Sequence, residues 1–145
     1  MAHISRSALV PHTAIAMFEL VHDVDRYKEF LPWCTDSGVL VDNGDERKAY
    51  VTISKGGVSK SFTTLNRAQR GKMLEIRLVE GPFKRLDGYW RFQDLGEDSS
   101  KVSLDLEFEF ANMFVRMAFG RVFEQLANRL VDAFVARAAE VYGRD

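Results

Sequence analysis

Residues 102–134 read VSLDLEFEFANMFVRMAFGRVFEQLANRLVDAF, and two hydrophobic periods meet inside this stretch. Apolar and polar residues alternate over 102–110, which predicts a strand with one buried and one solvated face. Asn112 is a suitable N-cap, and no proline interrupts the helical pattern from 113 to 142. We predict one helix of about 45 Å there. Its apolar face comprises Phe119, Val122, Phe123, Leu126, Leu130, Ala133, Phe134 and Val141.

The start of the chain carries the signals of one strand and two short helices. Apolar and polar residues alternate over 2–10, as in a strand. Thr13 is a suitable N-cap for the first helix, in which Ile15 falls on the apolar side. The second helix is predicted for 24–30, because Pro32 disfavours helical geometry in the residue before it.

Turn signals divide the middle of the chain into short strands. Asp42-Asn-Gly-Asp45 and Lys55-Gly-Gly57 have the composition of hairpin turns, and hairpins join antiparallel strands. The predicted strands cover 49–54, 58–65, 73–79, 86–95 and 102–110. We expect an α+β fold with a curved antiparallel sheet of about six to seven strands, two short helices after the first strand, and the long C-terminal helix across the sheet. Such a sheet leaves an apolar hollow beneath the helix, typically of several hundred Å³.

Composition excludes several classes of protein. The 145 residues, 46% of them hydrophobic, suit one domain over 1–145. No apolar run is long enough for a transmembrane helix and the N-terminus does not resemble a signal peptide, so we expect a soluble, cytoplasmic protein. One cysteine, Cys34, and three scattered histidines leave no disulfide and no metal site. We find no catalytic motif, assign no catalytic residue, and expect a protein that is not an enzyme and requires no cofactor.

The net charge of -1 conceals a basic middle segment. Residues 47–91 contain eleven Lys and Arg against three acids, whereas residues 92–110 contain one Lys against six acids. Cross-strand pairing explains part of this difference if the acidic strand lies beside Arg91. What remains is a candidate surface for RNA or anionic lipid, and we expect no DNA partner. Its representative residues are Arg67, Arg70, Lys72, Lys84 and Arg85.

Two aromatic motifs have both a structural and a functional interpretation. Tyr27-Lys-Glu-Phe-Leu-Pro-Trp-Cys34 either ends a helix in the core or lies at the mouth of a cavity. Gly81-Pro-Phe-Lys-Arg85 is either an ordinary hairpin or a rim loop, in which an exposed or half-buried Phe83 and two cations contact a membrane or a polyanion.

These motifs resemble the START-like (Bet v 1-type, helix-grip) superfamily, specifically the family of coenzyme-Q-binding proteins and bacterial ribosome-association toxins. The resemblance runs nearly end to end through Tyr27–Cys34, Gly81–Phe92, Phe108-Glu-Phe110 and Ala118–Tyr142. It implies a helix-grip domain that binds ubiquinone or a similar polyprenyl quinone, with a peripheral position at the inner face of the respiratory membrane. It equally implies the alternative, binding to the large ribosomal subunit.

The resemblance also assigns a cavity wall, residue by residue. An aromatase or cyclase activity rests on analogy of fold alone, and we find no polar catalytic group to support it. The ligand-binding residues implied are Phe30, Leu31, Trp33, Phe83, Trp90, Phe92, Phe108, Phe119, Phe123 and Leu126.

Overall fold

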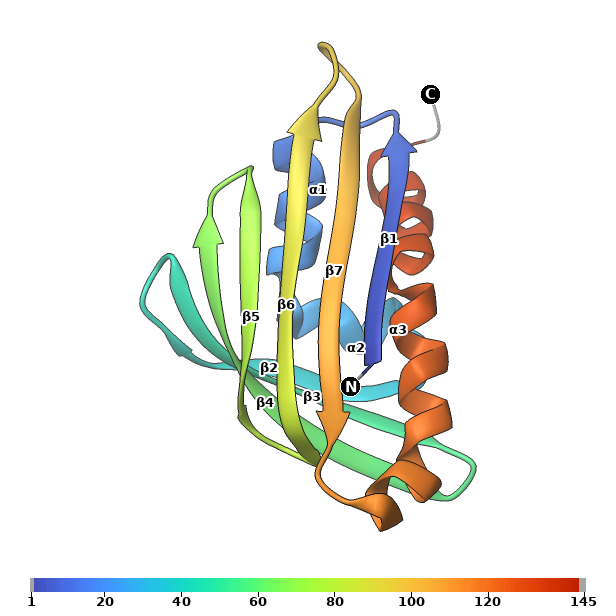
Figure 1. Cartoon of the computed structure of the whole chain (residues 1–145). Coiled ribbons are helices and arrows are strands. Elements are labelled where there is room, and N and C mark those ends of the chain that lie inside the picture. Colours follow the sequence, from blue (N-terminus) through green and yellow to red (C-terminus); the bar gives the residue numbers. More distant parts are fainter. Residues whose placement is uncertain (1, 144–145) are drawn as a thin grey trace.

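A strongly curved antiparallel sheet wraps around the C-terminal helix in the computed structural model, which describes residues 2–143 (Figure 1). The predicted span 1–145 extends beyond the described residues at both ends. The sheet has seven strands in the order β1-β7-β6-β5-β4-β3-β2, so the first strand pairs with the last. The strands are β1 (Ala2–Val10), β2 (Cys34–Asp42), β3 (Glu46–Lys55), β4 (Val58–Gln69), β5 (Met73–Glu80), β6 (Phe83–Asp94) and β7 (Ser100–Phe110).

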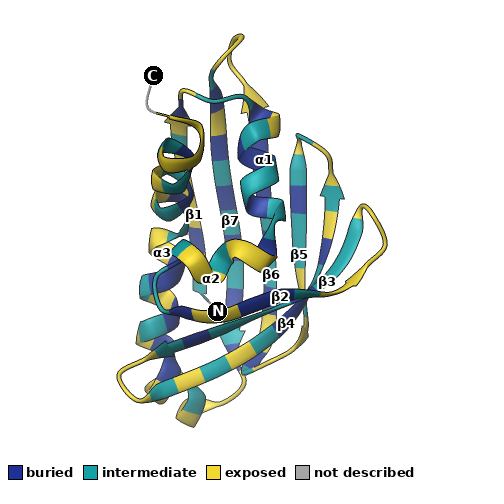
Figure 2. Ribbon diagram, turned by 180° about the vertical axis from the view of Figure 1, so that it is seen from behind, coloured by how far each residue is buried: buried dark blue, intermediate teal, exposed yellow. Residues whose placement is uncertain are grey.

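The helices all cover the same, concave face of the sheet. Figure 2 shows α1 (Ala14–His22), α2 (Tyr27–Phe30) and α3 (Met113–Tyr142) in front of β1, β7 and β6, while β2, β3 and β4 curl round towards the viewer. A single 3₁₀ turn, Val24–Arg26, joins α1 to α2. The inward side chains of the strands and of α3 therefore form one core, and α1 and α2 close it from above. This is the predicted α+β architecture.

Local side-chain chemistry fixes the helix ends where the sequence predicts them. Thr13 Oγ1 accepts a hydrogen bond from the backbone N–H of Ala16 at 3.2 Å, and Asn112 Oδ1 accepts one from Val115 at 2.9 Å. The N–H of Ala14 donates to Asp94 Oδ1 at 2.9 Å, which ties α1 to the end of β6. Leu31, the residue before the proline, has extended geometry and ends α2 as predicted.

Two details of the helix faces were predicted wrongly. Ile15 and Val141 were placed with the apolar residues, yet their side chains are 41% and 49% exposed. The buried face of α1 carries Ala14, Met17, Phe18 and Val21, and Val141 lies in the last turn of α3 beside a surface groove. The strands also run further than predicted, since the β3–β4 ladder continues from Lys55↔Val58 to Glu46↔Arg67 through polar residues.

Gly88 permits close packing where β6 pairs with β7. A Cβ atom at this position would lie 2.8 Å from Leu106 Cδ1 and 3.3 Å from the carbonyl oxygen of Asp105. A strand glycine of this kind commonly marks a bend or a close approach of two backbones. Residues of β3, β4 and β5 lie opposite α3, and the candidate site lies between them.

Candidate functional site

An apolar cavity of about 90 Å³ lies between α3 and the inner face of the sheet. It is far smaller than the several hundred Å³ that the fold led us to expect, because aromatic rings fill the end of the hollow nearest the start of α3. Strands β3 to β7, α3 and the segment from the 3₁₀ turn to Leu31 supply its walls. The residues that line it are Val24, Tyr27, Leu31, Ala49, Val51, Phe62, Thr64, Asn66, Ile76, Leu86, Trp90, Leu106, Phe123, Leu126, Ala127, Leu130 and Phe134.

Four of the ten predicted wall residues do line this cavity: Leu31, Trp90, Phe123 and Leu126. They come from the turn after α2, from β6 and from consecutive turns of α3. The structure therefore brings together residues that are almost 100 positions apart in the sequence. All four side chains are buried.

Three other predicted wall residues belong to a packed aromatic cluster. Phe83, Phe108 and Phe119 surround Phe123, with ring centroids 4.7, 4.9 and 5.8 Å from it. Most of these contacts are edge-to-face, a geometry that fills space efficiently. The rings contact each other rather than the cavity. Phe83 is buried, which agrees with the interpretation of its motif as an ordinary hairpin and not with an exposed or half-buried ring in a rim loop.

The remaining three predicted wall residues lie elsewhere. Phe92 packs edge-to-face on Phe18 beneath α1, with ring centroids 5.8 Å apart. Phe30 faces a surface groove. Trp33 lies at the surface beside the β3–β4 hairpin, with Lys55 Nζ 3.9 Å from its ring centroid and the Arg129 guanidinium carbon at 5.3 Å. The alternation of each strand and the matching of motifs predicted that these rings lie near the core. They did not predict whether a ring lines the cavity or packs elsewhere.

The sequence prediction missed the polar side chains of the wall. Thr64 and Asn66 occupy inward positions of β4, are buried, and are linked by a hydrogen bond of 2.8 Å that Thr64 Oγ1 donates to Asn66 Oδ1. The hydroxyl of Tyr27 donates to the carbonyl of Val21. Burial, with a smaller contribution from Asp23, raises the pKa of Tyr27 well above its usual range, so this phenol stays neutral. Polar residues at alternate, inward positions of a strand were the signal that could have revealed the pair.

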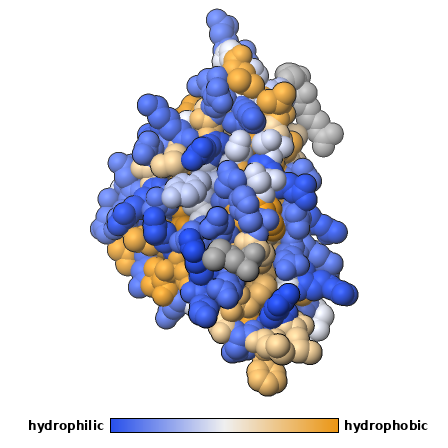
Figure 3. All heavy atoms as spheres, viewed as in Figure 1, coloured by the Kyte–Doolittle hydropathy of each residue, from blue (hydrophilic) through white to orange (hydrophobic). Residues whose placement is uncertain are grey.

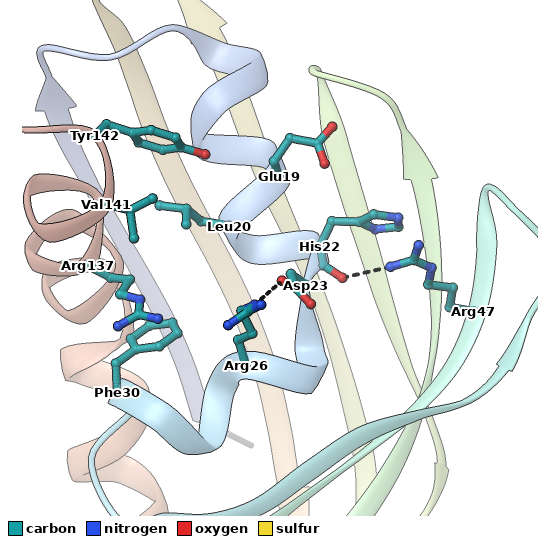
Figure 4. A pocket seen from close by; sticks show the side chains of 10 residues that line it. All are labelled: Glu19, Leu20, His22, Asp23, Arg26, Phe30, Arg47, Arg137, Val141 and Tyr142. Atoms are coloured by element: carbon teal, nitrogen blue, oxygen red, sulfur yellow. Dashed lines mark hydrogen bonds and ion pairs between the residues drawn. The ribbon is translucent and has the colours of Figure 1, made fainter.

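A larger groove of about 400 Å³ opens between α1, the 3₁₀ turn and the end of α3 (Figure 4). Its arginines are already paired. Arg26 lies 3.3 Å from Asp23, Arg47 lies 3.3 Å from Asp42, and Arg137 lies 2.9 Å from Glu29. Burial and the neighbouring guanidinium of Arg47 lower the pKa of His22, which the groove also contains. Because the arginines of this groove are engaged in ion pairs and the wall of the other cavity is apolar, we take the apolar cavity as the candidate site.

Ion pairs also occupy much of the predicted basic surface. Arg67 contacts Glu46 at 2.9 Å, Arg70 contacts Glu19 at 2.8 Å, and Arg85 contacts Asp87 at 2.6 Å. The β6–β7 register places Arg85 opposite Glu109, on the acidic strand. Cross-strand pairing therefore explains part of the charge asymmetry, and Lys72 and Lys84 are left exposed.

The cavity wall offers little for acid–base chemistry. Among the described residues that line it, Tyr27 is the one titratable side chain. Cys34 is buried beside the turn, and desolvation raises the pKa of its thiol to about 11. No group of three or more His, Cys, Asp or Glu side chains in residues 2–143 is arranged to hold a metal ion.

Comparisons with known proteins agree with the fold and add names of relatives. Residues 10–135 match the family model described as polyketide cyclase / dehydrase and lipid transport. The chain is 48% identical over 141 residues to the ribosome association toxin RatA of Pseudomonas aeruginosa, covering 97% of this chain and 98% of that protein. It is 25% identical over 146 residues to the mitochondrial coenzyme Q-binding protein coq10 of Schizosaccharomyces pombe, covering 91% and 84% of the two chains.

Among solved structures, the fold is similar to that of the Zhui aromatase/cyclase from Streptomyces sp. R1128. The TM-score is 0.84, with 99% of each chain covered and 16% sequence identity. At that identity the likeness concerns the fold alone.

Proposed function

Because the chain belongs to the polyketide cyclase / dehydrase and lipid transport family, in the branch that includes proteins named ribosome association toxins, we propose that it binds an apolar lipid of the polyprenyl quinone class in the cavity beneath α3. The observation that carries this proposal is the apolar lining of that cavity. The name of the coenzyme Q-binding relative supports the choice of lipid. The protein would act as a carrier rather than an enzyme, in the cytoplasm beside the respiratory membrane.

The polar pair on β4 gives the cavity a means of orienting a quinone ring. Since Thr64 donates to the oxygen of the Asn66 amide, the amide N–H groups remain as donors for a carbonyl oxygen in the cavity. A quinone carbonyl accepts such a bond, and its prenyl tail requires only apolar contacts. One buried polar group in an apolar wall is a common basis for orientation in ligand sites.

Uptake requires the roof of the cavity to move. A volume of 90 Å³ is well below the ~300 Å³ at which ligand pockets typically begin. Helix α2 is the element best suited to move, because it has four residues, of which Tyr27 and Phe30 are half-buried and the other two are exposed. Its rings rest on α3, where Tyr27 and Phe30 pack edge-to-face on Phe134 at 5.3 and 5.2 Å. Outward displacement of these two rings would extend the cavity towards the surface.

We expect the purified protein to release a quinone or similar lipid on extraction with organic solvent, detected by mass spectrometry. Trp90 lines the cavity whereas Trp33 lies at the surface, so Trp33→Phe leaves one tryptophan as a reporter. Added short-chain ubiquinone should then quench the remaining fluorescence in a saturable way. Absence of any extracted lipid, together with absence of saturable quenching, would exclude the proposal.

Two variants on β4 test the role of the amide. Asn66→Leu removes the donor and should weaken ubiquinone binding about tenfold, as expected for one lost hydrogen bond in a dry site. Thr64→Val is the matched control, since it breaks the pair but keeps the amide N–H groups. Equal affinities for the two variants would mean that Asn66 does not contact the ligand.

A second candidate function, association with the large ribosomal subunit, is favoured by the name of the relative at 48% identity. We expect such binding to use cations outside ion pairs, such as Lys72 and Lys84, and to weaken steeply with salt. In a sucrose gradient at low salt the protein should sediment with the large subunit, and Lys72→Gln with Lys84→Gln should shift it towards the top. Wild-type protein that stays at the top at low salt would exclude this function.

A further inference from the structure

The first turns of α3 expose three large apolar side chains at one end of the molecule. Met113, Phe114 and Met117 are 73%, 84% and 78% exposed, and we call them the apolar tip. Figure 3 shows hydrophobic atoms gathered at the lower end of the molecule, where α3 begins. Exposed apolar residues are ordinary when scattered singly, but a cluster on adjacent helical turns marks a site of contact.

Cations surround this tip. The N–H of Ala111 donates to the carbonyl of Pro82 at 3.0 Å, so the segment 81–85 lies beside the start of α3. Together, residues 81–85 and 111–121 contain four Lys and Arg and no acid. Arg85 is the one of these four that forms an ion pair in the described part of the chain, and Lys84, Arg116 and Arg121 are exposed. Of the neighbouring acids, Glu80 and Asp87 flank the segment 81–85, whereas Glu109 and Glu124 border the same surface hollow as Arg116.

We propose that the apolar tip and its cations dock the protein on an anionic phospholipid bilayer. The three side chains would enter the layer between headgroups and acyl chains, while Lys84 and Arg121 would contact lipid phosphates. A protein partner fits less well, because a standard interface takes about 20–30 residues from each side and the tip offers three. None of the helices within residues 2–143 has the length and apolar character of a membrane span, so the contact is peripheral.

The apolar tip lies close to the cavity, so docking would help a lipid to pass between the membrane and the protein. This consequence rests on the proposed function. Phe114 precedes Phe123, which lines the cavity, by nine residues of continuous helix, or about 14 Å along the axis. A protein docked by its tip therefore holds the cavity close to the layer where a polyprenyl lipid resides. Docking itself does not depend on the identity of the cargo.

The test is flotation with vesicles of phosphatidylcholine mixed with phosphatidylglycerol, using the full chain. Wild-type protein should float with these vesicles. Combined replacement Met113→Ser, Phe114→Ser and Met117→Ser should lower the partition coefficient by at least about a hundredfold, given the usual gain from burying one such side chain. Because all three positions are exposed, we expect the variant to keep its fold, and circular dichroism checks this. Leu9→Ser, which removes an equally exposed leucine from β1, should float like wild type.

A variant without two of the cations measures the electrostatic contribution to binding separately from that of the apolar tip. Lys84→Gln with Arg121→Gln should reduce binding to the mixed vesicles roughly thirtyfold and leave binding to pure phosphatidylcholine unchanged. Wild type that does not float, or a triple-serine variant that floats equally well, would overturn the proposal. A triple-serine variant that still floats but no longer sediments with large ribosomal subunits would overturn it too and assign the tip to the ribosome. Ubiquinone uptake measured in vesicle-free solution reports separately on the cavity.

Discussion

Replacement of Phe108 by alanine is expected to lower the free energy of unfolding by about 3–5 kcal/mol. The Phe108 ring is almost completely buried and packs edge-to-face on Phe110 and Phe123, at 5.6 and 4.9 Å. It lies in the packed aromatic cluster, where surrounding rings cannot collapse into the space that a removed phenyl group leaves. Urea denaturation followed by circular dichroism measures the loss.

The matched control is the same substitution at the cavity wall. Phe62 also packs edge-to-face on two rings, those of Phe83 and Phe123. It is only half-buried, however, and borders the existing cavity, so its removal loses less buried apolar surface and opens less new space. Phe62→Ala should cost about half as much as Phe108→Ala. Equal losses at the two positions would mean that the cluster is no more tightly packed than the wall.

Replacement of Ala127 by leucine should abolish ubiquinone uptake and leave the fold intact. Ala127 is fully buried on α3 and borders the cavity, so three added carbon atoms would occupy much of its 90 Å³. Filling a cavity often stabilises a protein by about 0.5–2 kcal/mol, whereas overpacking costs about 1–3, so we expect little net change in stability. Quinone affinity should fall more than tenfold in the fluorescence assay.

Ala136→Leu is the control for this variant, because it makes the same change at an exposed position of the same helix. It should bind ubiquinone like the wild type. If Ala127→Leu also binds normally, the ligand is held outside the cavity, and the groove beside Arg137 becomes the site to examine.

The elements at the end of the chain could be predicted from the sequence alone. Apolar and polar residues alternate strictly over 102–110, which predicts β7. Asn112 and the uninterrupted helical period after it predict α3, and few other assignments fit this stretch. Local signals suffice there because period, cap and breaker agree. The two short helices could be predicted for the same reason, because Thr13 caps α1 and Pro32 requires α2 to end before it.

The cavity could not be predicted residue by residue. Alternation states which side of a strand faces inward, but not where along the strand the helix packs closely and where it leaves space. Phe92 and Trp90 share one face of β6, yet Trp90 borders the cavity and Phe92 supports α1. The solvent-facing side of the sheet posed the same problem. Arg85 pairs with Glu107 on the neighbouring strand at 3.4 Å, and only the register of β6 against β7 brings these two side chains together.

Helix α3 is one rigid rod that carries both the apolar tip and a wall of the cavity. No proline interrupts its 30 residues, so the helix tilts as a single body. A change of angle at the apolar tip therefore also moves the residues of α3 that line the cavity. If α3 tilts on contact with a surface, the separation between Phe123 and the strands below it must change as well. If membrane docking changes the affinity for the lipid ligand by some factor, thermodynamic linkage requires that the bound ligand change the affinity of the apolar tip for the membrane by the same factor.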